Sequence, residues 1–205
     1  PWASGRVEVY TWSGSAWVLK GAPIDAGVDK YDGAGWKCQL SDDGNVIAIS
    51  CTNDVWHQFK NKGAHGKGHV RVYEYNGGWT QKGQTLWGSY HTSGPNAGSQ
   101  RGTGFSHSVA INGAGDTLIV GEQDFNATYD GINSSYGTLG WGRAHIYTYS
   151  YSQGWVLFQT FENPDYPNQP TRFGHVVSID RSGDTIAVGA YRSKPTVLDG
   201  GASRL

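Results

Sequence analysis

The chain has 205 residues, including 31 Gly, 9 Trp and 12 Tyr, and only 16% of its residues are charged. Its formal net charge is −1 and it has no run of Lys or Arg, which excludes an electrostatic surface for nucleic acid or for an anionic membrane. The longest apolar runs, such as residues 46–49, are much shorter than the ~20 residues of a membrane-spanning helix. Because Gly suits tight turns, and aromatic and β-branched residues suit pleated strands, this composition predicts many short strands.

The first predicted element is a β-hairpin at the N-terminus. Residues 5–10 alternate between apolar and polar side chains, with Val7 and Val9 on one face. Residues 13–15 are typical of a turn, and Trp17 opens the return strand. The chain begins with Pro1 rather than Met, so we expect that its true N-terminus is processed or missing.

The second predicted hairpin contains both cysteines of the chain. A two-residue turn within residues 42–45 would place Cys38 opposite Ile49 and Cys51 opposite Trp36. The two thiols would then be diagonal neighbours on one face, slightly far apart for a disulfide, although a bulge could bring them together. We expect a Cys38–Cys51 disulfide, and two small buried thiols are the alternative.

Both hairpins recur along the chain, which is the most informative feature of the sequence. The cysteine-containing hairpin recurs with its turn glycine at positions 44, 115 and 183. The N-terminal hairpin recurs with the same Gly-x-Val/Ala-x-Val/Ile-Tyr strand, at residues 5–10, 68–73 and 142–147, each followed by a turn and a Trp (Trp17, Trp79 and Trp155).

With the strands of one repeat named a, b, c and d, the chain has the order c-d, a-b-c-d, a-b-c-d, a-b. A repeat of this size with four antiparallel strands is typical of a propeller blade, and no segment has a helical period. The predicted fold is therefore all-β, a single β-propeller region over residues 1–205 with about three blades' worth of sequence. We expect a partial blade at 1–30, blades at 31–86 and 102–161, and a partial blade at 171–205.

Two of the repeats resemble a known family. Residues 105–110 (Phe-Ser-His-Ser-Val-Ala) and 173–178 (Phe-Gly-His-Val-Val-Ser), each followed by Gly-Asp-Thr and an apolar run, resemble FG-GAP repeats. These are the blades of integrin α-subunit propellers and of many secreted or surface proteins, including large extracellular proteins of algae and marine bacteria. The resemblance implies an extracellular or cell-surface location. Calcium-binding FG-GAP loops carry more carboxylates than the turns at 42–45, 113–116 and 181–184, so we expect no structural calcium there.

The long connections are predicted to lie on one rim of the propeller. The a–b and c–d turns are short, whereas the b–c and d–a connections are long and are expected to carry any binding function. The aromatic, imidazole and carboxylate side chains expected on this rim are Trp56, His57, Tyr90, His91, Asp124, Tyr129, Asp130 and Trp141. They could dock a protein or stack on sugar rings, or they could simply anchor their own loops.

Two N-glycosylation sequons lie in the same kind of connection. Asn126-Ala-Thr and Asn133-Ser-Ser match the acceptor pattern, so Asn126 and Asn133 are predicted glycosylation sites if the protein is secreted by a eukaryote. Chance occurrence in a chain rich in Asn, Ser and Thr is the alternative.

The histidines and carboxylates predict neither a metal site nor a catalytic site. His107 and His175 occupy the same repeat position as Trp36, which indicates a framework position. His145 shares its position with Glu8 and Arg71, which predicts an exposed site. No pair of carboxylates is singled out for glycoside hydrolysis and no cofactor motif is present.

The sequence therefore predicts a non-catalytic extracellular module that is structural or adhesive. Its expected partners are other protein subunits or further blades, with glycans as an additional class and without nucleic acid or membrane insertion. A carbohydrate-binding, lectin-like propeller is the first alternative, and a polysaccharide-active enzyme is the second. Because a propeller needs about four to eight blades, we expect either further chain or copies that complete one another.

Overall fold

In a computed structural model of the protein, the described residues are 4–27, 32–52, 67–89, 102–125, 140–163 and 171–193. They form thirteen β-strands and no helix, which confirms the predicted all-β class. No helix among them is therefore long and apolar enough to cross a membrane. The strands are β1 Tyr10–Trp12, β2 Trp17–Leu19, β3 Ala34–Leu40, β4 Val46–Cys51, β5 His69–Tyr75, β6 Trp79–Gln81, β7 Leu86–Trp87, β8 Phe105–Ile111, β9 Thr117–Glu122, β10 Arg143–Ser150, β11 Gly154–Glu162, β12 Val176–Ile179 and β13 Ile186–Gly189.

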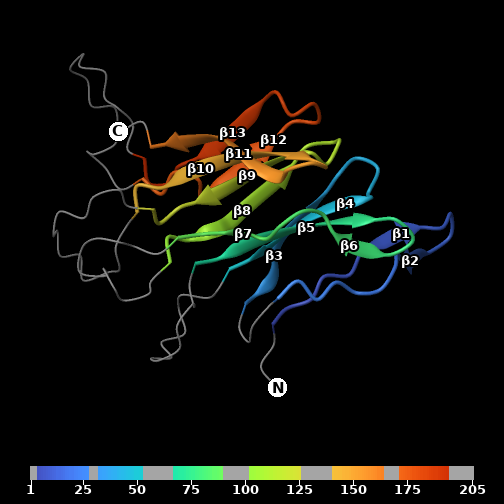
Figure 1. Cartoon of the computed structure of the whole chain (residues 1–205). Coiled ribbons are helices and arrows are strands. Elements are labelled where there is room, and N and C mark those ends of the chain that lie inside the picture. The colour runs from blue at the N-terminus through green and yellow to red at the C-terminus, as the bar shows by residue number, and fades with distance from the viewer. Residues whose placement is uncertain are drawn as a thin grey trace, which may run out of the picture.

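The strands form four antiparallel sheets that follow the repeat order of the sequence (Figure 1). One complete sheet has the order β3-β4-β5-β6, with β7 also paired to β5, and the other has the order β11-β10-β9-β8. The hairpins β1-β2 and β12-β13 form two-stranded sheets on either side of these. Relative to the complete sheets, β1-β2 corresponds to the third and fourth strands and β12-β13 corresponds to the first and second.

Three apolar clusters join neighbouring sheets, so that the inner strands β4 and β9 of the two complete sheets are buried on both faces. In β4, Val46 and Ala48 face the β8–β11 sheet, while Ile47 and Ile49 face the β1-β2 hairpin. This alternation follows from the two-residue side-chain period of a strand. The third cluster packs Ala110, Ile119 and Ala144 against β12-β13.

Glycines at the start of each third strand allow the next sheet to approach closely. Gly5, Gly68 and Gly142 all have positive φ angles, between 70° and 88°. A Cβ atom at any of them would collide with the backbone of Ala34, Phe105 or Phe173, the first residues of the following repeat. The repeated Gly of the sequence pattern is therefore a contact point between repeats as well as a backbone requirement.

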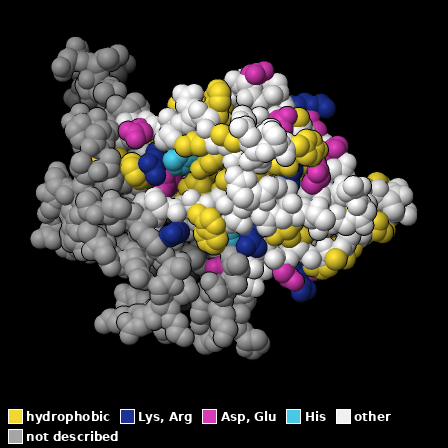
Figure 2. All heavy atoms as spheres, viewed as in Figure 1, with side chains coloured by type: hydrophobic (Ala, Val, Ile, Leu, Met, Phe, Trp, Pro, Cys, Tyr) yellow, Lys and Arg dark blue, Asp and Glu magenta, His cyan; other side chains and the backbone are white. Residues whose placement is uncertain are grey.

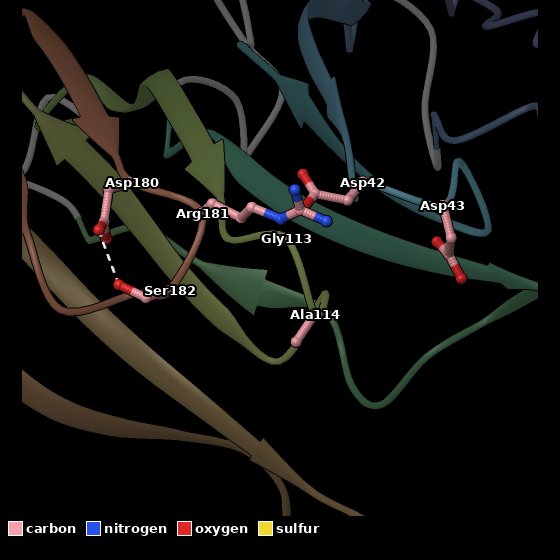
Figure 3. Close-up of a pocket in the computed structure, with 7 residues that line it drawn as sticks. All are labelled: Asp42, Asp43, Gly113, Ala114, Asp180, Arg181 and Ser182. Atoms are coloured by element: carbon pink, nitrogen blue, oxygen red, sulfur yellow. Dashed lines mark hydrogen bonds and ion pairs between the residues drawn. The ribbon is translucent and has the colours of Figure 1, made fainter.

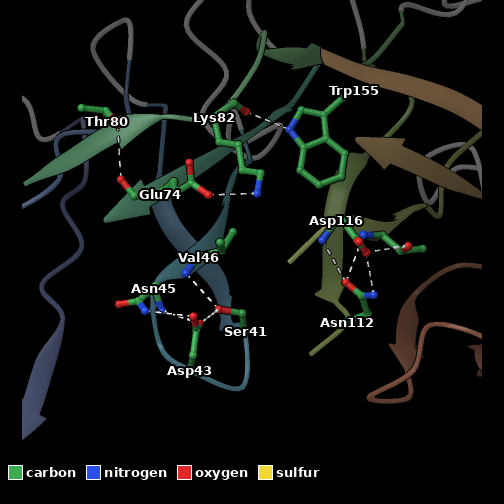
Figure 4. A network of polar contacts seen from close by, with 11 residues as sticks. Ser41, Asp43, Asn45, Val46, Glu74, Thr80, Lys82, Asn112, Asp116 and Trp155 are labelled. Atoms are coloured by element: carbon green, nitrogen blue, oxygen red, sulfur yellow. Dashed lines mark hydrogen bonds and ion pairs between the residues drawn. The ribbon is translucent and has the colours of Figure 1, made fainter. Parts of the chain in front are cut away.

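The repeated tryptophans also join one sheet to the next. The indole nitrogen of Trp155 donates a hydrogen bond of 2.8 Å to the carbonyl of Lys82, as Figure 4 shows. The indole nitrogen of Trp79 donates one of 2.6 Å to the carbonyl of Lys20. In each case the lysine lies at the end of the fourth strand of the preceding repeat. Its ammonium group lies over a tyrosine ring beside the tryptophan, 5.0 Å from Tyr75 for Lys20 and 4.7 Å from Tyr149 for Lys82.

The two cysteines are free thiols in this structure, so the predicted disulfide is not formed. Cys38 pairs with Ile49 as expected, but Cys51 pairs with Ala34 rather than with Trp36. The reason is a register shift within β3, between Ala34 and Cys38, rather than at the turn. Cys51 is fully buried, and burial, followed by the charge of Asp32, raises its pKa to about 12, whereas Cys38 is exposed.

Candidate functional site

A row of aromatic and imidazole rings crosses the first strands of three successive repeats. The ring centroids of Trp36 and His107 are 6.0 Å apart, those of His107 and His175 are 4.8 Å apart, and those of His175 and Tyr191 are 4.4 Å apart. Trp36 lies in β3, His107 lies in β8, and His175 directly precedes β12. The structure thus places the three equivalent positions of the repeat in consecutive contact.

Backbone irregularities locate the rings of this row. The pairing of β3 with β4 shifts between Ala34 and Cys38, and that of β8 with β9 shifts between Phe105 and Ser108. Trp36 and His107 lie within these two irregular segments. An irregularity of this kind re-aims side chains away from the regular faces of a sheet. Trp36 is 57% exposed at one end of the row, and Tyr191, which follows β13, is 54% exposed at the other end.

The two imidazoles of the row favour the neutral form. Burial, and then the nearby His175, Arg172 and Lys37, lower the pKa of His107 to about 4. Burial and the charges of Arg172 and Lys37 also lower the pKa of His175. The Nδ1 atom of His175 lies 2.6 Å from Oε1 of Gln123, and a neutral ring that carries its proton on Nδ1 donates this hydrogen bond. Near neutral pH the row is therefore a set of uncharged flat rings.

Two of the residues predicted on the long-connection rim lie close to this row. The carboxylate of Asp124 forms an ion pair with Arg172 at 3.4 Å, and Arg172 donates a hydrogen bond of 3.3 Å from Nη1 to the hydroxyl of Tyr191. The carbonyl of Trp141 accepts a hydrogen bond of 2.9 Å from the amide of Phe173. Both contacts tie the connection after β9 to the following repeat.

The other predicted rim residues and both sequons lie outside the described residues. These positions are Trp56, His57, Tyr90, His91, Tyr129, Asp130, Asn126 and Asn133. They stay predictions.

A buried polar cluster surrounds Glu122 at the end of β9. Its carboxylate accepts hydrogen bonds from Thr103 and Arg143, and one of 3.1 Å from Ser89. The Nε2 atom of His145 lies 2.7 Å from the same carboxylate. Burial of Glu122 raises its pKa, but the hydrogen bonds and charges of His145 and Arg143 outweigh burial, so that the pKa is lowered overall. The carboxylate is thus held ionised in a structural role.

The prediction that His145 is exposed is wrong. The residue is buried, because its ring lies between Glu122 and Thr160, with Nδ1 at 3.0 Å from the Thr160 hydroxyl. Glu8 is exposed at the equivalent position of the first hairpin. A repeat position can therefore change from surface to interior when the neighbouring strand supplies a buried carboxylate.

At the strand ends opposite to the long connections, the short a–b turns of three repeats are linked by backbone hydrogen bonds. The amide of Asp42 donates to the carbonyl of Gly113 at 3.0 Å, and the amide of Gly113 donates to the carbonyl of Arg181 at 2.9 Å. These three residues occupy one repeat position. The side chain of Arg181 crosses the turn of Gly113 to pair with Asp42 (Figure 3).

A shallow hollow lies at these turns and is lined by residues of all three of them, including Asp43, Ala114 and Ser182. The carboxylates in it already have partners, since Asp43 accepts from Ser41 at 2.7 Å and Asp180 accepts from Ser182 at 2.7 Å. No group of three or more potential metal ligands occurs anywhere in the described part of the chain. The backbone hydrogen bonds between the turns align the three repeats.

Comparison with protein-family models gives no match for this chain. No curated protein matches it significantly either.

Proposed function

We propose that the protein is a non-catalytic, extracellular structural or adhesion module, built as part of a β-propeller of the FG-GAP type. The observation that carries this proposal is the repetition of the same contacts between successive sheets. Trp79 and Trp155 each bond to a lysine carbonyl of the preceding repeat, and Gly5, Gly68 and Gly142 each admit the following repeat. Such contacts extend a stack of sheets and create a rigid scaffold.

The ionisable side chains that could take part in catalysis are better suited to a structural role than to an enzymatic one. Glu122 is 1% exposed and is paired with Arg143 and His145. A general acid or base must reach a substrate, whereas this carboxylate is enclosed by its own hydrogen-bond donors. The ionised state of Glu122 thus stabilises the second complete sheet instead of serving proton transfer.

The partners that we propose are proteins that bind the rim of long b–c and d–a connections. The described ends of these connections are fixed to the sheets, since Asp124 pairs with Arg172 and the amide of Asp124 donates to the carbonyl of Thr103 at 3.0 Å. A rigid scaffold with long connections on one rim is a common arrangement for binding surfaces.

The test is to locate the protein and to assay it for catalysis. An antibody raised against the chain should label the surface of intact cells of the source organism, and external protease should remove the signal. The purified chain should release no sugar from a panel of polysaccharides. Labelling that requires permeabilised cells would contradict the location, and turnover that is lost on substitution of a carboxylate would contradict the non-catalytic role.

The ring row supports a second candidate, a lectin-like function. Trp36 and Tyr191 are exposed at the two ends of a series of uncharged rings, and flat rings of this kind stack on the apolar faces of sugars. A glycan array tests this directly. Glycan binding that is abolished by Trp36→Ala and retained by Tyr151→Ser, which changes an exposed ring outside the row, would establish the lectin. An array without binding would exclude it.

A further inference from the structure

The ring row of Trp36, His107, His175 and Tyr191 follows the first strands of the repeats, which lie side by side. β8 packs against β3 on one side and against β12 on the other. The row therefore advances by one ring with each repeat from Trp36 to His175, and Tyr191 after β13 extends it further. An elongated surface of this kind fits a chain-like ligand that spans several repeats.

The imidazoles of the row have polar atoms that the protein itself does not use. Nδ1 of His175 is bonded to Gln123, but Nε2 of His175 and both ring nitrogens of His107 form no hydrogen bond with the described residues. A neutral imidazole offers one N–H donor and one acceptor. Sugar hydroxyls both donate and accept, and the apolar face of a sugar ring can lie on an aromatic side chain. The row thus offers both kinds of contact that a saccharide makes.

Each end of the row carries a cation that is not paired with a carboxylate of the described residues. Lys37 directly follows the exposed Trp36, and Arg192 directly follows the exposed Tyr191. Both cations are themselves exposed, and neither forms an ion pair within the described part of the chain. The guanidinium carbon of Arg192 lies 5.4 Å from the centroid of the Tyr191 ring, and its Nε donates a hydrogen bond of 3.2 Å to the Tyr191 hydroxyl. Both exposed rings therefore have a positive charge beside them.

The middle of the row has a positive environment as well. The charges that lower the pKa of His107 and His175 all belong to cations, Arg172 and Lys37 among them. Arg172 is compensated by its ion pair with Asp124 at 3.4 Å. The charge available to a ligand is therefore concentrated at the two ends of the row.

We infer that the ring row binds an acidic saccharide chain, one whose sugars carry carboxylate or sulfate groups. Trp36 and Tyr191 stack on sugar rings, and Lys37 and Arg192 pair with the acidic groups beside them. The imidazoles in the middle of the row exchange hydrogen bonds with sugar hydroxyls. The inference rests on the lectin-like candidate function of the same row and specifies its class of ligand.

The charge pattern favours an acidic saccharide over a single-stranded nucleic acid. A nucleic acid needs positive charge along its whole backbone and aromatic faces on which successive bases can stack. The rings of this row are already in contact with one another, so that a base cannot enter between His107 and His175. Figure 2 shows the Lys and Arg side chains scattered over the face in view rather than gathered into one stripe.

Isothermal titration calorimetry with matched oligosaccharides tests the inference. Oligogalacturonate and its methyl ester differ only in the charge of the carboxyl groups, and dextran sulfate and dextran differ in sulfate. The affinity for at least one acidic member should exceed that for its neutral partner by at least about ten-fold. The pair that shows this difference identifies the acidic group. Raising the NaCl concentration from about 50 mM to about 500 mM should weaken binding of the acidic member, because salt screens exposed charges.

Substitutions in the row separate the contribution of the rings from that of the charges. Trp36→Ala should weaken the binding of the acidic oligosaccharide by at least about ten-fold, because a stacking surface is lost. Lys37→Gln and Arg192→Gln should each weaken it by about two- to five-fold and should leave any binding of the neutral partner unchanged. Far-ultraviolet circular dichroism should be unchanged in all three variants, since the three side chains are exposed.

Two exposed positions outside the row supply matched controls. Tyr151→Ser removes an exposed ring, and Arg181→Gln removes an exposed cation at the short a–b turns. Both variants should bind the acidic oligosaccharides as tightly as the unchanged protein. An equal loss of affinity in Arg181→Gln and Lys37→Gln would show that only the overall charge matters and would overturn the assignment of the site.

Other results would overturn the inference in distinguishable ways. Equal affinity for acidic and neutral partners, lost on Trp36→Ala, would overturn the acidic class and leave the lectin-like function intact. No binding of any oligosaccharide would overturn both. Tighter binding of oligothymidylate or of polyglutamate than of any oligosaccharide would assign the row to a nucleic acid or to an acidic peptide instead. Labelling at the cell surface tests the structural or adhesive role separately, whichever of these results is found.

Discussion

At the scale of single residues, buried charge and uncharged imidazoles determine much of the local chemistry. Glu122 is enclosed with Arg143 and His145, and its pKa is lowered because their hydrogen bonds and charges outweigh its burial. His107 and His175 are instead kept neutral by burial and by nearby cations. Both arrangements make the folded state prefer the protonation states found near neutral pH.

Glu122→Gln should lower the free energy of unfolding by about 3 kcal/mol, because removal of one partner leaves a buried charge uncompensated. Urea denaturation followed by tryptophan fluorescence measures this change. The exposed Glu8→Gln substitution is the control and should change stability by less than about 0.5 kcal/mol. Equal effects of the two substitutions would contradict the structural role of the Glu122 cluster.

The pKa of His107 predicts a pH dependence of stability. Since its pKa in the folded protein is about 4, against an ordinary value of 6.5, the unfolded chain binds more protons between these values. Stability is therefore full above pH 6.5 and is lost as the pH falls towards 4. After a discount for partial exposure, the loss due to His107 is on the order of 1–2 kcal/mol.

The measurement is the urea midpoint of the protein and of His107→Gln between pH 4 and pH 7. The variant should show a smaller loss of stability on acidification, although His175 and His69, whose pKa values are also lowered, keep part of the dependence. Identical pH profiles for the two proteins would rule out His107 as a contributor.

At the scale of elements, each sheet is joined to the next by a tryptophan and a glycine at fixed positions. Trp155 is buried against Lys82, and Gly142 lies against the backbone of Phe173. These contacts explain why the sequence repeats these two residue types. Bulges in the first strands then place the ring row outside the regular faces.

Trp155→Ala should destabilise the protein by about 3–5 kcal/mol, since a large buried side chain and its hydrogen bond are removed. Trp155→Phe should cost less, because it keeps most of the apolar contact and leaves mainly the Lys82 carbonyl without its donor. Thermal unfolding measures the series. If the two substitutions were equally mild, Trp155 would not be the contact that joins the sheets.

Gly142→Ala should destabilise the protein by more than about 1 kcal/mol, because the position has a φ of 82° and a Cβ atom there would collide with Phe173. Gly78→Ala is the matched control. No atom lies within 4 Å of a Cβ at Gly78, so this change should be close to neutral by urea denaturation. A neutral Gly142→Ala would show that the following repeat is not held there.

At the scale of the whole molecule, the described sheets form a stack whose interior and ends differ. The inner strands β4 and β9 of the complete sheets are buried on both faces, whereas the described residues of β1-β2 and β12-β13 have one packed face and one exposed face. Stability should therefore decrease from the centre of the stack to its ends.

Hydrogen exchange measures this gradient. Amides of β4 and β9 should exchange most slowly, and those of β1 and β13 should exchange fastest. Uniform protection along the chain would contradict the stacked arrangement.

The sequence by itself determined the class, the strands and their order. Periodic glycines and tryptophans mark the hairpins, because a turn with positive φ needs Gly and strand pairing needs side chains that alternate between two faces. The alignment of repeats also placed Trp36, His107 and His175 in one position, but it could not show that their rings are in contact.

Only the tertiary structure decided how the equivalent residues are used. Because of the register shift in β3, Cys51 lies opposite Ala34 and both thiols are free. His145 is buried beside the carboxylate of Glu122, with which it pairs. A register shift of two residues in a strand and the pairing of a buried charge both depend on neighbours distant in the chain. Local sequence patterns do not indicate such distant neighbours. The repeat therefore predicted where the strands lie, and the packing between sheets decided which of their side chains are buried, exposed or paired.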